Sequence, residues 1–304
     1  MERTRKINIL LYITVAIYLA VTLCLKVFQI QLPVMLGLGL GQILVIVPTI
    51  LYFVIQRTNP LQLIRFRGLK PSVVFLVILV AFLLIPVVTF INSISLLFVE
   101  NEVAPVMTTL NSLPFGLGLL FIAIFPAVVE EFTFRGVYYH TYLQNGIWKG
   151  IFLSAFIFGL MHMNINQFSY AFVLGIFLAL IVEATGSIFS AMLVHFIING
   201  NSYVLSYLVS HMQTGASTSV DMIEMADMTV LPFYMLTVLF LFVVASVCLF
   251  LLYLLYKQIA KISGREQYFN ALCHRKIRPP YIEPTVDIYL GLAILLCIVE
   301  MIWF

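Results

Sequence analysis

The sequence predicts an all-α, polytopic membrane protein made of eight core spans and one additional C-terminal span. Composition is the first reason: 62% of the residues are hydrophobic and 10% are charged, whereas soluble domains carry roughly 25% charged residues. The mean hydropathy of +1.10 agrees with this class. The second reason is that nine apolar stretches reach or approach the roughly 20 residues that a helix needs to cross a bilayer.

We treat 1–304 as a single transmembrane domain with a motif-bearing core at 114–200. A proline-containing loop at 259–284 separates the last stretch from the others, so 286–304 is expected to be an appended span. The nine stretches are Ile7–Leu25, Leu32–Ile55, Val73–Val99, Pro114–Glu130, Trp148–His162, Phe168–Glu183, Ser187–Val209, Leu231–Tyr256 and Ile288–Phe304.

Charged residues alternate between the loops. Basic clusters at 3–6, 57–70 and 257–278 alternate with acidic loops at 100–102 and 221–227. Lys and Arg are concentrated in cytoplasmic loops of membrane proteins. The N-terminus is therefore predicted to be cytoplasmic and the C-terminus to lie on the opposite side.

The remaining composition argues against several other classes. A net charge of +3 with the basic residues confined to loops makes nucleic acid an unexpected partner. The four cysteines show no C-x-x-C spacing, so neither a zinc finger nor a disulfide framework is expected. The first apolar stretch is too long for a signal peptide and is interpreted as a retained span.

The first motif is Glu130-Glu131-x-x-x-Arg135, which directly follows an apolar run. Ionisable residues at membrane depth are costly and are functional candidates. Glu131 and Arg135 are four residues apart and share a helix face, where they can pair, whereas Glu130 points to a different face. The alternative is a helix end that reaches the headgroups. Pro126, four residues before Glu130, is expected to kink this helix.

Two further motifs contain histidine. Phe158 and His162 are four residues apart, as are His195 and Asn199, so each pair shares a helix face. A single interfacial histidine is more often structural than catalytic. Polar side chains in hydrocarbon nevertheless need partners, because each unsatisfied group costs several kcal/mol.

A helical hairpin would link the first two motifs. If Asn145-Gly146 is its tip, Glu130 and His162 both lie 16 residues from Gly146, about 24 Å along the helices. They would then lie at one level within the bilayer. The amphipathic run 134–143 would form a base projecting from the membrane, with His140 at the interface.

Together these motifs resemble the CPBP family, the CAAX-protease and bacteriocin-processing intramembrane proteases. This family is also called Abi and is related to the eukaryotic prenyl-protein endopeptidase Rce. The resemblance covers about 114–200 and includes Phe-Arg-Gly at 134–136, Phe-Gly-Leu-Met-His at 158–162 and Thr-Gly-Ser-Ile at 185–188. It implies a hydrolase, an intramembrane endopeptidase.

Peptide hydrolysis needs an activated water, a proton donor and donors for the oxyanion. Glu130 is the candidate general base, which is also the role that the resemblance implies. His162 would hold the water and shuttle a proton, and His195 with Asn199 would form the oxyanion hole. Glu131 and Arg135 are expected to play a structural, orienting part, and Glu183 to pair near a turn.

A zinc mechanism is the alternative chemistry. Glu130, His162 and His195 could supply two histidines and one carboxylate with an open position for water. The chain has no H-E-x-x-H motif, whose spacing would form such a site locally. We therefore favour a metal-free glutamate mechanism with no cofactor.

The expected partners are membrane lipid and a peptide or protein-tail substrate. The resemblance implies a prenylated CAAX tail or a bacteriocin or signalling precursor, and the choice stays open, as does the oligomeric state. Two competing classes are a non-proteolytic regulator or immunity protein that binds a partner or peptide, and a transporter. A transporter would more often show Gly- or Pro-interrupted helices in corresponding halves, which this sequence lacks.

Overall fold

The computed structural model describes residues 2–213, 230–274 and 285–303, and every regular element in these residues is a helix. Among the described residues, seven helices are long and apolar enough to cross a membrane, and two shorter apolar helices accompany them. These nine helices coincide with the nine predicted stretches, so the predicted all-α, polytopic class is confirmed. The acidic residues at 221–227 and the prolines at 279–280 lie outside the described residues.

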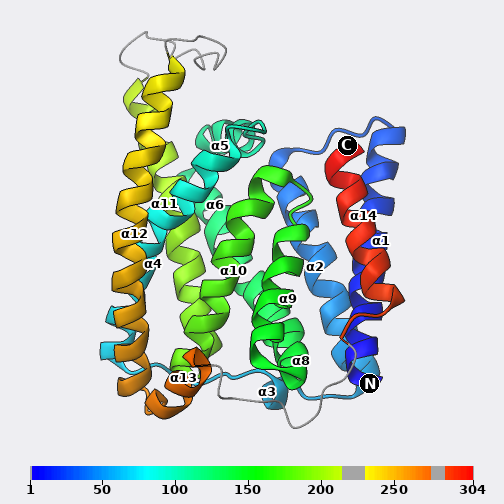
Figure 1. Cartoon of the computed structure of the whole chain (residues 1–304). Coiled ribbons are helices and arrows are strands. Elements are labelled where there is room, and N and C mark those ends of the chain that lie inside the picture. Colours follow the sequence, from blue (N-terminus) through cyan, green and yellow to red (C-terminus); the bar gives the residue numbers. More distant parts are fainter. Residues whose placement is uncertain (1, 214–229, 275–284, 304) are drawn as a thin grey trace.

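The helices cross the molecule in alternating directions. α1 (Glu2–Val27) starts at the end where the short helices α3 (Pro60–Leu63), α8 (His140–Tyr142) and α13 (Glu266–Cys273) lie (Figure 1). We call this the N-terminal end. α5 (Val103–Asn111) lies at the other end, which we call the α5 end. α14 (Ile288–Trp303), the last described helix, finishes at the α5 end, opposite to the start of α1 (Figure 1).

The remaining elements follow in order. They are α2 (Val34–Gln56), α4 (Pro71–Ser95), α6 (Phe115–Leu119), the π-helix η1 (Leu120–Ile124), α7 (Phe125–Glu130), the π-helix η2 (Glu131–Tyr139), the 3-10 turn η3 (Leu143–Asn145), α9 (Ile147–Leu160), α10 (Ile165–Thr185), α11 (Ile188–Gln213), α12 (Val230–Ile262) and α14 (Ile288–Trp303).

The fourth span is longer than the sequence predicted. It runs without interruption from Phe115 to Asn145, whereas the apolar pattern predicted an end at Glu130. Two π-helical segments, η1 and η2, lie within it, and such segments are frequent at functional sites. The extra turns carry the motif residues after Glu130 into the bundle.

The run 134–143, predicted to form a base that projects from the membrane with His140 at the interface, is buried among other helices of the protein. Tyr138, Tyr139 and Tyr142 are at most 2% exposed, and His140 is 7% exposed. The hydroxyl of Tyr142 donates to Asn8 of α1, and Nδ1 of His140 lies 2.6 Å from the carbonyl of Arg135. The polar tips that suggested an interface instead find partners inside the protein.

The predicted hairpin tip at Asn145-Gly146 is present. Gly146 adopts φ 126°, a conformation that residues with a side chain rarely adopt, and α9 begins at the next residue. α10 packs against α9, α4 and α11, while α12 lies along α4. The core of the bundle therefore forms around α4, α10 and α11.

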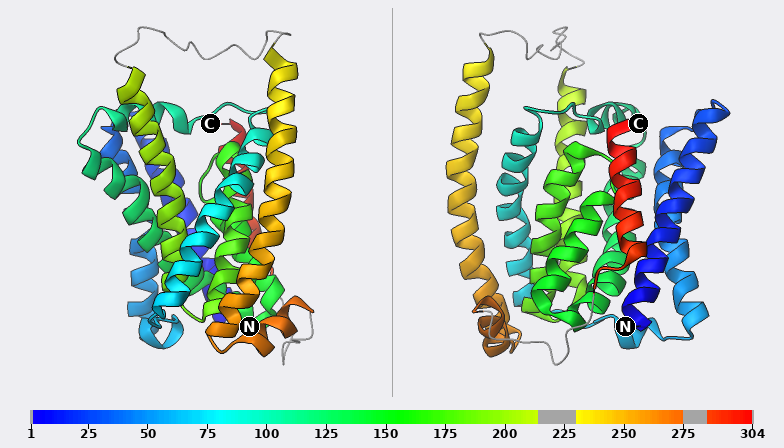
Figure 2. Two further views of the ribbon diagram at one scale, coloured as in Figure 1. Left: turned by 90° about the vertical axis from the view of Figure 1, so that its left-hand side faces the viewer. Right: turned by 45° about the vertical axis from the view of Figure 1, so that its right-hand side comes forward.

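The C-terminal helix is attached through α1. α14 lies along α1, as the right-hand view of Figure 2 shows. Its residues Leu290, Ala293 and Cys297 are at most 2% exposed and belong to the same apolar core as Ile7 and Val15 of α1. The last span is thus an edge helix with a continuous packed interface.

Candidate active site

The four candidate catalytic side chains line one cavity of about 480 Å³. Glu130 comes from the end of α7, His162 follows α9, and His195 and Asn199 are one turn apart on α11. Three separate helices therefore bring these groups together, which is the arrangement that the motif spacing required.

Behind the cavity lies a fully buried charged cluster. Nη1 of Arg135 is 2.9 Å from Oε1 of Glu131, and both side chains are 0% exposed. Nδ1 of His195 lies 2.8 Å from the same Glu131 oxygen. The predicted Glu131–Arg135 pair is thus present, and its carboxylate also contacts the histidine on α11.

Glu130 faces the cavity and is 14% exposed. Nε2 of Gln42 donates a hydrogen bond of 2.9 Å to its Oε1, and Nε2 of His195 lies 3.9 Å from its Oε2. Sequence reasoning missed Gln42. The available signal was an amide in the middle of an apolar α2, where a polar side chain needs a partner.

An aromatic ring separates the two histidines. The ring of Phe158 lies 5.0 Å from the His162 ring and 5.9 Å from the His195 ring, edge-on in both cases. The guanidinium of Arg135 lies 4.2 Å from the Phe158 centroid, a cation–π distance. Nδ1 of His162 is 2.8 Å from the carbonyl of Phe158, which leaves Nε2 for the cavity.

Asn199 supplies a hydrogen bond that a proline removes from the fourth span. Pro126 has no N–H to donate to the carbonyl of Ile122, four residues earlier. Nδ2 of Asn199 donates to that carbonyl at 3.1 Å. Proline is tolerated in membrane helices where a neighbouring side chain satisfies the freed carbonyl in this way. One N–H of the Asn199 amide is therefore used, and the second remains for the cavity.

The zinc alternative would use the same three side chains, Glu130, His162 and His195. Within the described ranges, no group of three His, Cys, Asp or Glu side chains is close enough to hold a metal ion. Nδ1 of His195 contacts Glu131, and a metal-ligating histidine also commonly donates its second ring N–H to a carboxylate, so this contact fits either chemistry.

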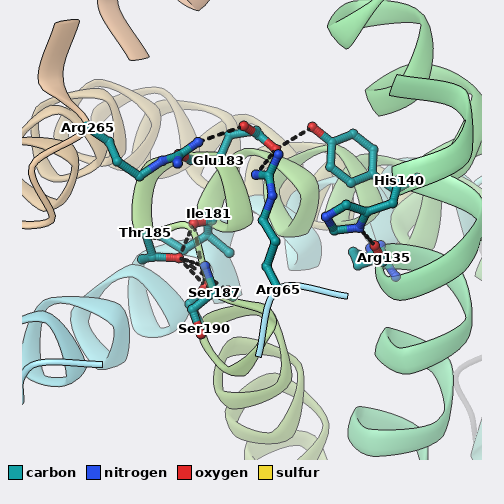
Figure 3. A network of polar contacts seen from close by, with 10 residues as sticks. Arg65, Arg135, His140, Ile181, Glu183, Thr185, Ser187, Ser190 and Arg265 are labelled. Carbon is teal, nitrogen blue, oxygen red and sulfur yellow. Dashed lines mark hydrogen bonds and ion pairs between the residues drawn. The ribbon is translucent and has the colours of Figure 1, made fainter. Parts of the chain in front are cut away.

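A second buried carboxylate fastens the N-terminal end (Figure 3). Glu183, at 0% exposure, accepts hydrogen bonds from Arg65 at 2.6 Å, from the Tyr139 hydroxyl at 2.9 Å and from Arg265 at 3.1 Å. Nε of Arg265 also donates to its backbone carbonyl. The expectation that Glu183 pairs near a turn is confirmed, with partners from two distant loops.

These features define a class: a multi-pass integral membrane protein with a carboxylate and two histidines in a cavity between helices. Residues 112–200 match the family described as "Rce1-like: Type II CAAX prenyl endopeptidase Rce1-like". The resemblance to the CPBP family is thereby confirmed over this segment, which contains every candidate residue named from the sequence. The match indicates a protease of the CAAX type acting on a peptide or protein tail. Neither the curated proteins nor the solved structures contain a significant match to the chain.

Proposed function

We propose that this protein is an intramembrane endopeptidase that hydrolyses a peptide bond in a membrane-associated peptide or protein tail, with Glu130 activating the water. One observation carries the proposal. The Glu130 carboxylate faces a cavity about 480 Å³ in volume, accepts a hydrogen bond from Gln42 and lies 3.9 Å from Nε2 of His195. The 3.9 Å between Nε2 of His195 and Oε2 of Glu130 is too long for a direct hydrogen bond.

Glu130 and His162 would handle the protons. Glu130 takes a proton from the attacking water, which it holds together with Nε2 of His162. The same proton is then passed to the amine that leaves. Because Nδ1 of His162 contacts the Phe158 carbonyl, the ring is held with Nε2 towards the cavity, as a proton shuttle requires.

His195 and Asn199 would stabilise the oxyanion. This needs Nε2 of His195 to carry a proton while Nδ1 also donates to Glu131, which is the imidazolium form. With that form, the two carboxylates Glu130 and Glu131 are balanced by Arg135 and His195, so the buried cluster is neutral. The second N–H of Asn199 supplies the other donor. Hydrogen-bond donors that already point to where the negative charge develops, in a site that excludes water, usually make the largest single contribution to stabilising the transition state.

The proposal is a metal-free mechanism, and zinc chemistry is its competitor. Support comes from the spacing of the three side chains, because the described residues contain no group of three His, Cys, Asp or Glu side chains close enough to hold a metal ion. Zinc held by Glu130, His162 and His195 would require these side chains to move. No step proposed here passes through a metal.

The test compares the wild type with Glu130→Gln in detergent. Cleavage of a peptide library is measured by mass spectrometry, with and without a chelator. We expect Glu130→Gln to abolish cleavage at an unchanged melting temperature, and the chelator to have no effect. Glu266→Gln, at an exposed carboxylate on α13 at the opposite end from the cavity, is the matched control and should cleave normally.

Three results would count against the proposal. Turnover by Glu130→Gln would remove this residue from the mechanism. Loss of activity on chelation that zinc restores would favour the metal mechanism. Tight peptide binding by the wild type without any cleavage would favour the non-proteolytic regulator or immunity protein.

A further inference from the structure

The catalytic cavity lies in the half of the bundle nearest the α5 end. α4 runs from the N-terminal end to the α5 end (Figure 1), and the cavity touches only its late residues, such as Thr89 and Asn92. α10 runs the other way and contributes early residues, such as Asn166. Val103 and Met107 of α5 complete the lining. The α5 segment is thus the rim of the cavity.

The opposite direction is closed by buried side chains. Glu131 directly follows Glu130, and Arg135 lies about one turn further towards the N-terminal end; both are 0% exposed. The stacked rings of Tyr138 and Tyr142 follow, each at most 2% exposed. No tyrosine hydroxyl in this stretch of η2 and α8 lines the cavity. A peptide could not pass this packed segment.

The loop between α2 and α4 seals the same end from outside. The backbone N–H of Ile188 donates to the carbonyl of Arg65 at 3.0 Å, and the Ser187 hydroxyl donates to the carbonyl of Arg67. Arg65 and Arg265 hold the buried Glu183 (Figure 3). Two loops are therefore fastened over the α10–α11 turn.

Charge separates the two ends. The described Lys and Arg residues lie at the closed end, apart from Lys26 at the end of α1 and Arg135 in the interior; Glu100 and Glu102 precede α5 at the rim. The residues at the closed end are Arg3, Arg5, Lys6, Arg57, Arg65, Arg67, Lys70, Lys149, Lys257, Lys261 and Arg265. Because Lys and Arg are concentrated in cytoplasmic loops, this distribution predicts that the closed end is the cytoplasmic one.

We infer that the site takes its substrate from the extracytoplasmic side. The inference rests on the proposed function and narrows the substrate to a peptide or protein tail presented at that face of the membrane. A tail that stays on the cytoplasmic side would meet the packed tyrosines and the fastened loops instead of the cavity. Secreted or membrane-anchored precursor peptides have the required location, whereas prenylated tails in the cytoplasm do not.

The native cysteines allow the orientation to be measured. Cys273, exposed on α13, reports the closed end, while Cys248 and Cys297 are buried. A Cys24→Ser protein leaves Cys273 as the accessible thiol. A Cys24→Ser, Cys273→Ser, Glu102→Cys protein instead reports the rim. Intact bacterial cells expressing each protein are treated with a membrane-impermeant maleimide at mildly alkaline pH, because partial burial raises the pKa of the Cys273 thiol.

Reconstituted vesicles then give the side of entry. The two cysteine proteins are inserted into vesicles, and the fraction with each end outward is measured by the same labelling. A membrane-impermeant peptide library is added outside. We expect cleavage to rise in proportion to the fraction with the rim outward. In cells, we expect labelling at Glu102→Cys and none at Cys273.

Each other outcome points to a distinct failure. Cleavage that follows the fraction with Cys273 outward would overturn the side of entry and leave the endopeptidase intact. Labelling of Cys273 in intact cells would overturn the extracytoplasmic location. No cleavage in any orientation, together with none in detergent, would instead refute the proposed function.

Discussion

Nδ1 of His195 lies 2.8 Å from Oε1 of Glu131, the oxygen that Nη1 of Arg135 approaches at 2.9 Å. The second glutamate of the motif therefore touches a histidine of the cavity directly. The spacing of the motif indicated only a pair that orients its own helix. In the structure, the carboxylate ties the fourth span to α11 and fixes which nitrogen of His195 faces Glu130.

Glu131→Gln should lower both stability and rate. The amide keeps the shape of the side chain but leaves Arg135 buried without a carboxylate, and breaking a buried ion pair in this way costs about 3–5 kcal/mol. We expect a lower melting temperature and a fall in kcat of about 10- to 100-fold, corresponding to roughly 1.4–2.7 kcal/mol. Thermal melting and cleavage kinetics in detergent measure the two effects. An unchanged melting profile would contradict the structural part of this role.

Gln42→Leu should lower the rate without lowering stability. The substitution removes the hydrogen bond to Glu130. Leucine is similar in size to glutamine and suits the apolar surroundings of α2. Hydrogen bonds to charged groups contribute about 1.5–3 kcal/mol, so we expect kcat to fall at least about tenfold with little change in KM. The neighbouring Ile43→Ala, on the exposed face of α2, is the matched control. Equal kinetics for Gln42→Leu and the wild type would show that the contact does not serve Glu130.

The effects of Asn199→Ala and Pro126→Ala on the free energy of unfolding should not be additive. In the wild type, removing the Asn199 amide leaves the Ile122 carbonyl without its donor, at a cost of about 1–3 kcal/mol. In a Pro126→Ala background, the new N–H at residue 126 can donate to Ile122, so the same substitution should cost less. A double-mutant cycle of unfolding free energies measures the difference. Additive costs would show that Asn199 does not replace the missing donor.

The same cycle separates the two parts assigned to Asn199. Restoring the helix hydrogen bond does not restore an oxyanion donor. The double variant should therefore recover stability while its kcat remains as low as that of Asn199→Ala alone. Recovery of kcat together with stability would remove Asn199 from the oxyanion hole.

Glu183→Gln should loosen the loops at the N-terminal end. Its carboxylate balances Arg65 and Arg265 and accepts from Tyr139, so neutralising it leaves two cations facing each other around a buried amide. We expect a lower melting temperature and faster hydrogen exchange in 64–68 and in α13. Glu266→Gln, at an exposed carboxylate on α13, is the control. Unchanged exchange in both segments would show that Glu183 does not fasten them.

Much of this protein follows from local sequence pattern. Nine apolar stretches predicted the spans because each helix satisfies its own backbone in lipid, independently of its neighbours. Four-residue spacing predicted the Glu131–Arg135 pair and placed Phe158 with His162 and His195 with Asn199, because residues one helical turn apart share a face. The resemblance over 114–200 depended on the same local motifs.

Other features depended on contacts between elements far apart in the sequence, which no local pattern contains. Gln42 reaches Glu130 only because α2 packs beside the fourth span. Tyr139 and His140 are interior because α1, α9 and α10 cover them, although their polar tips suggested an interface. The closed and open ends of the cavity likewise arise from which loops cover which helix ends. Helical periodicity places side chains on a face, and only the packing of several helices decides what that face meets.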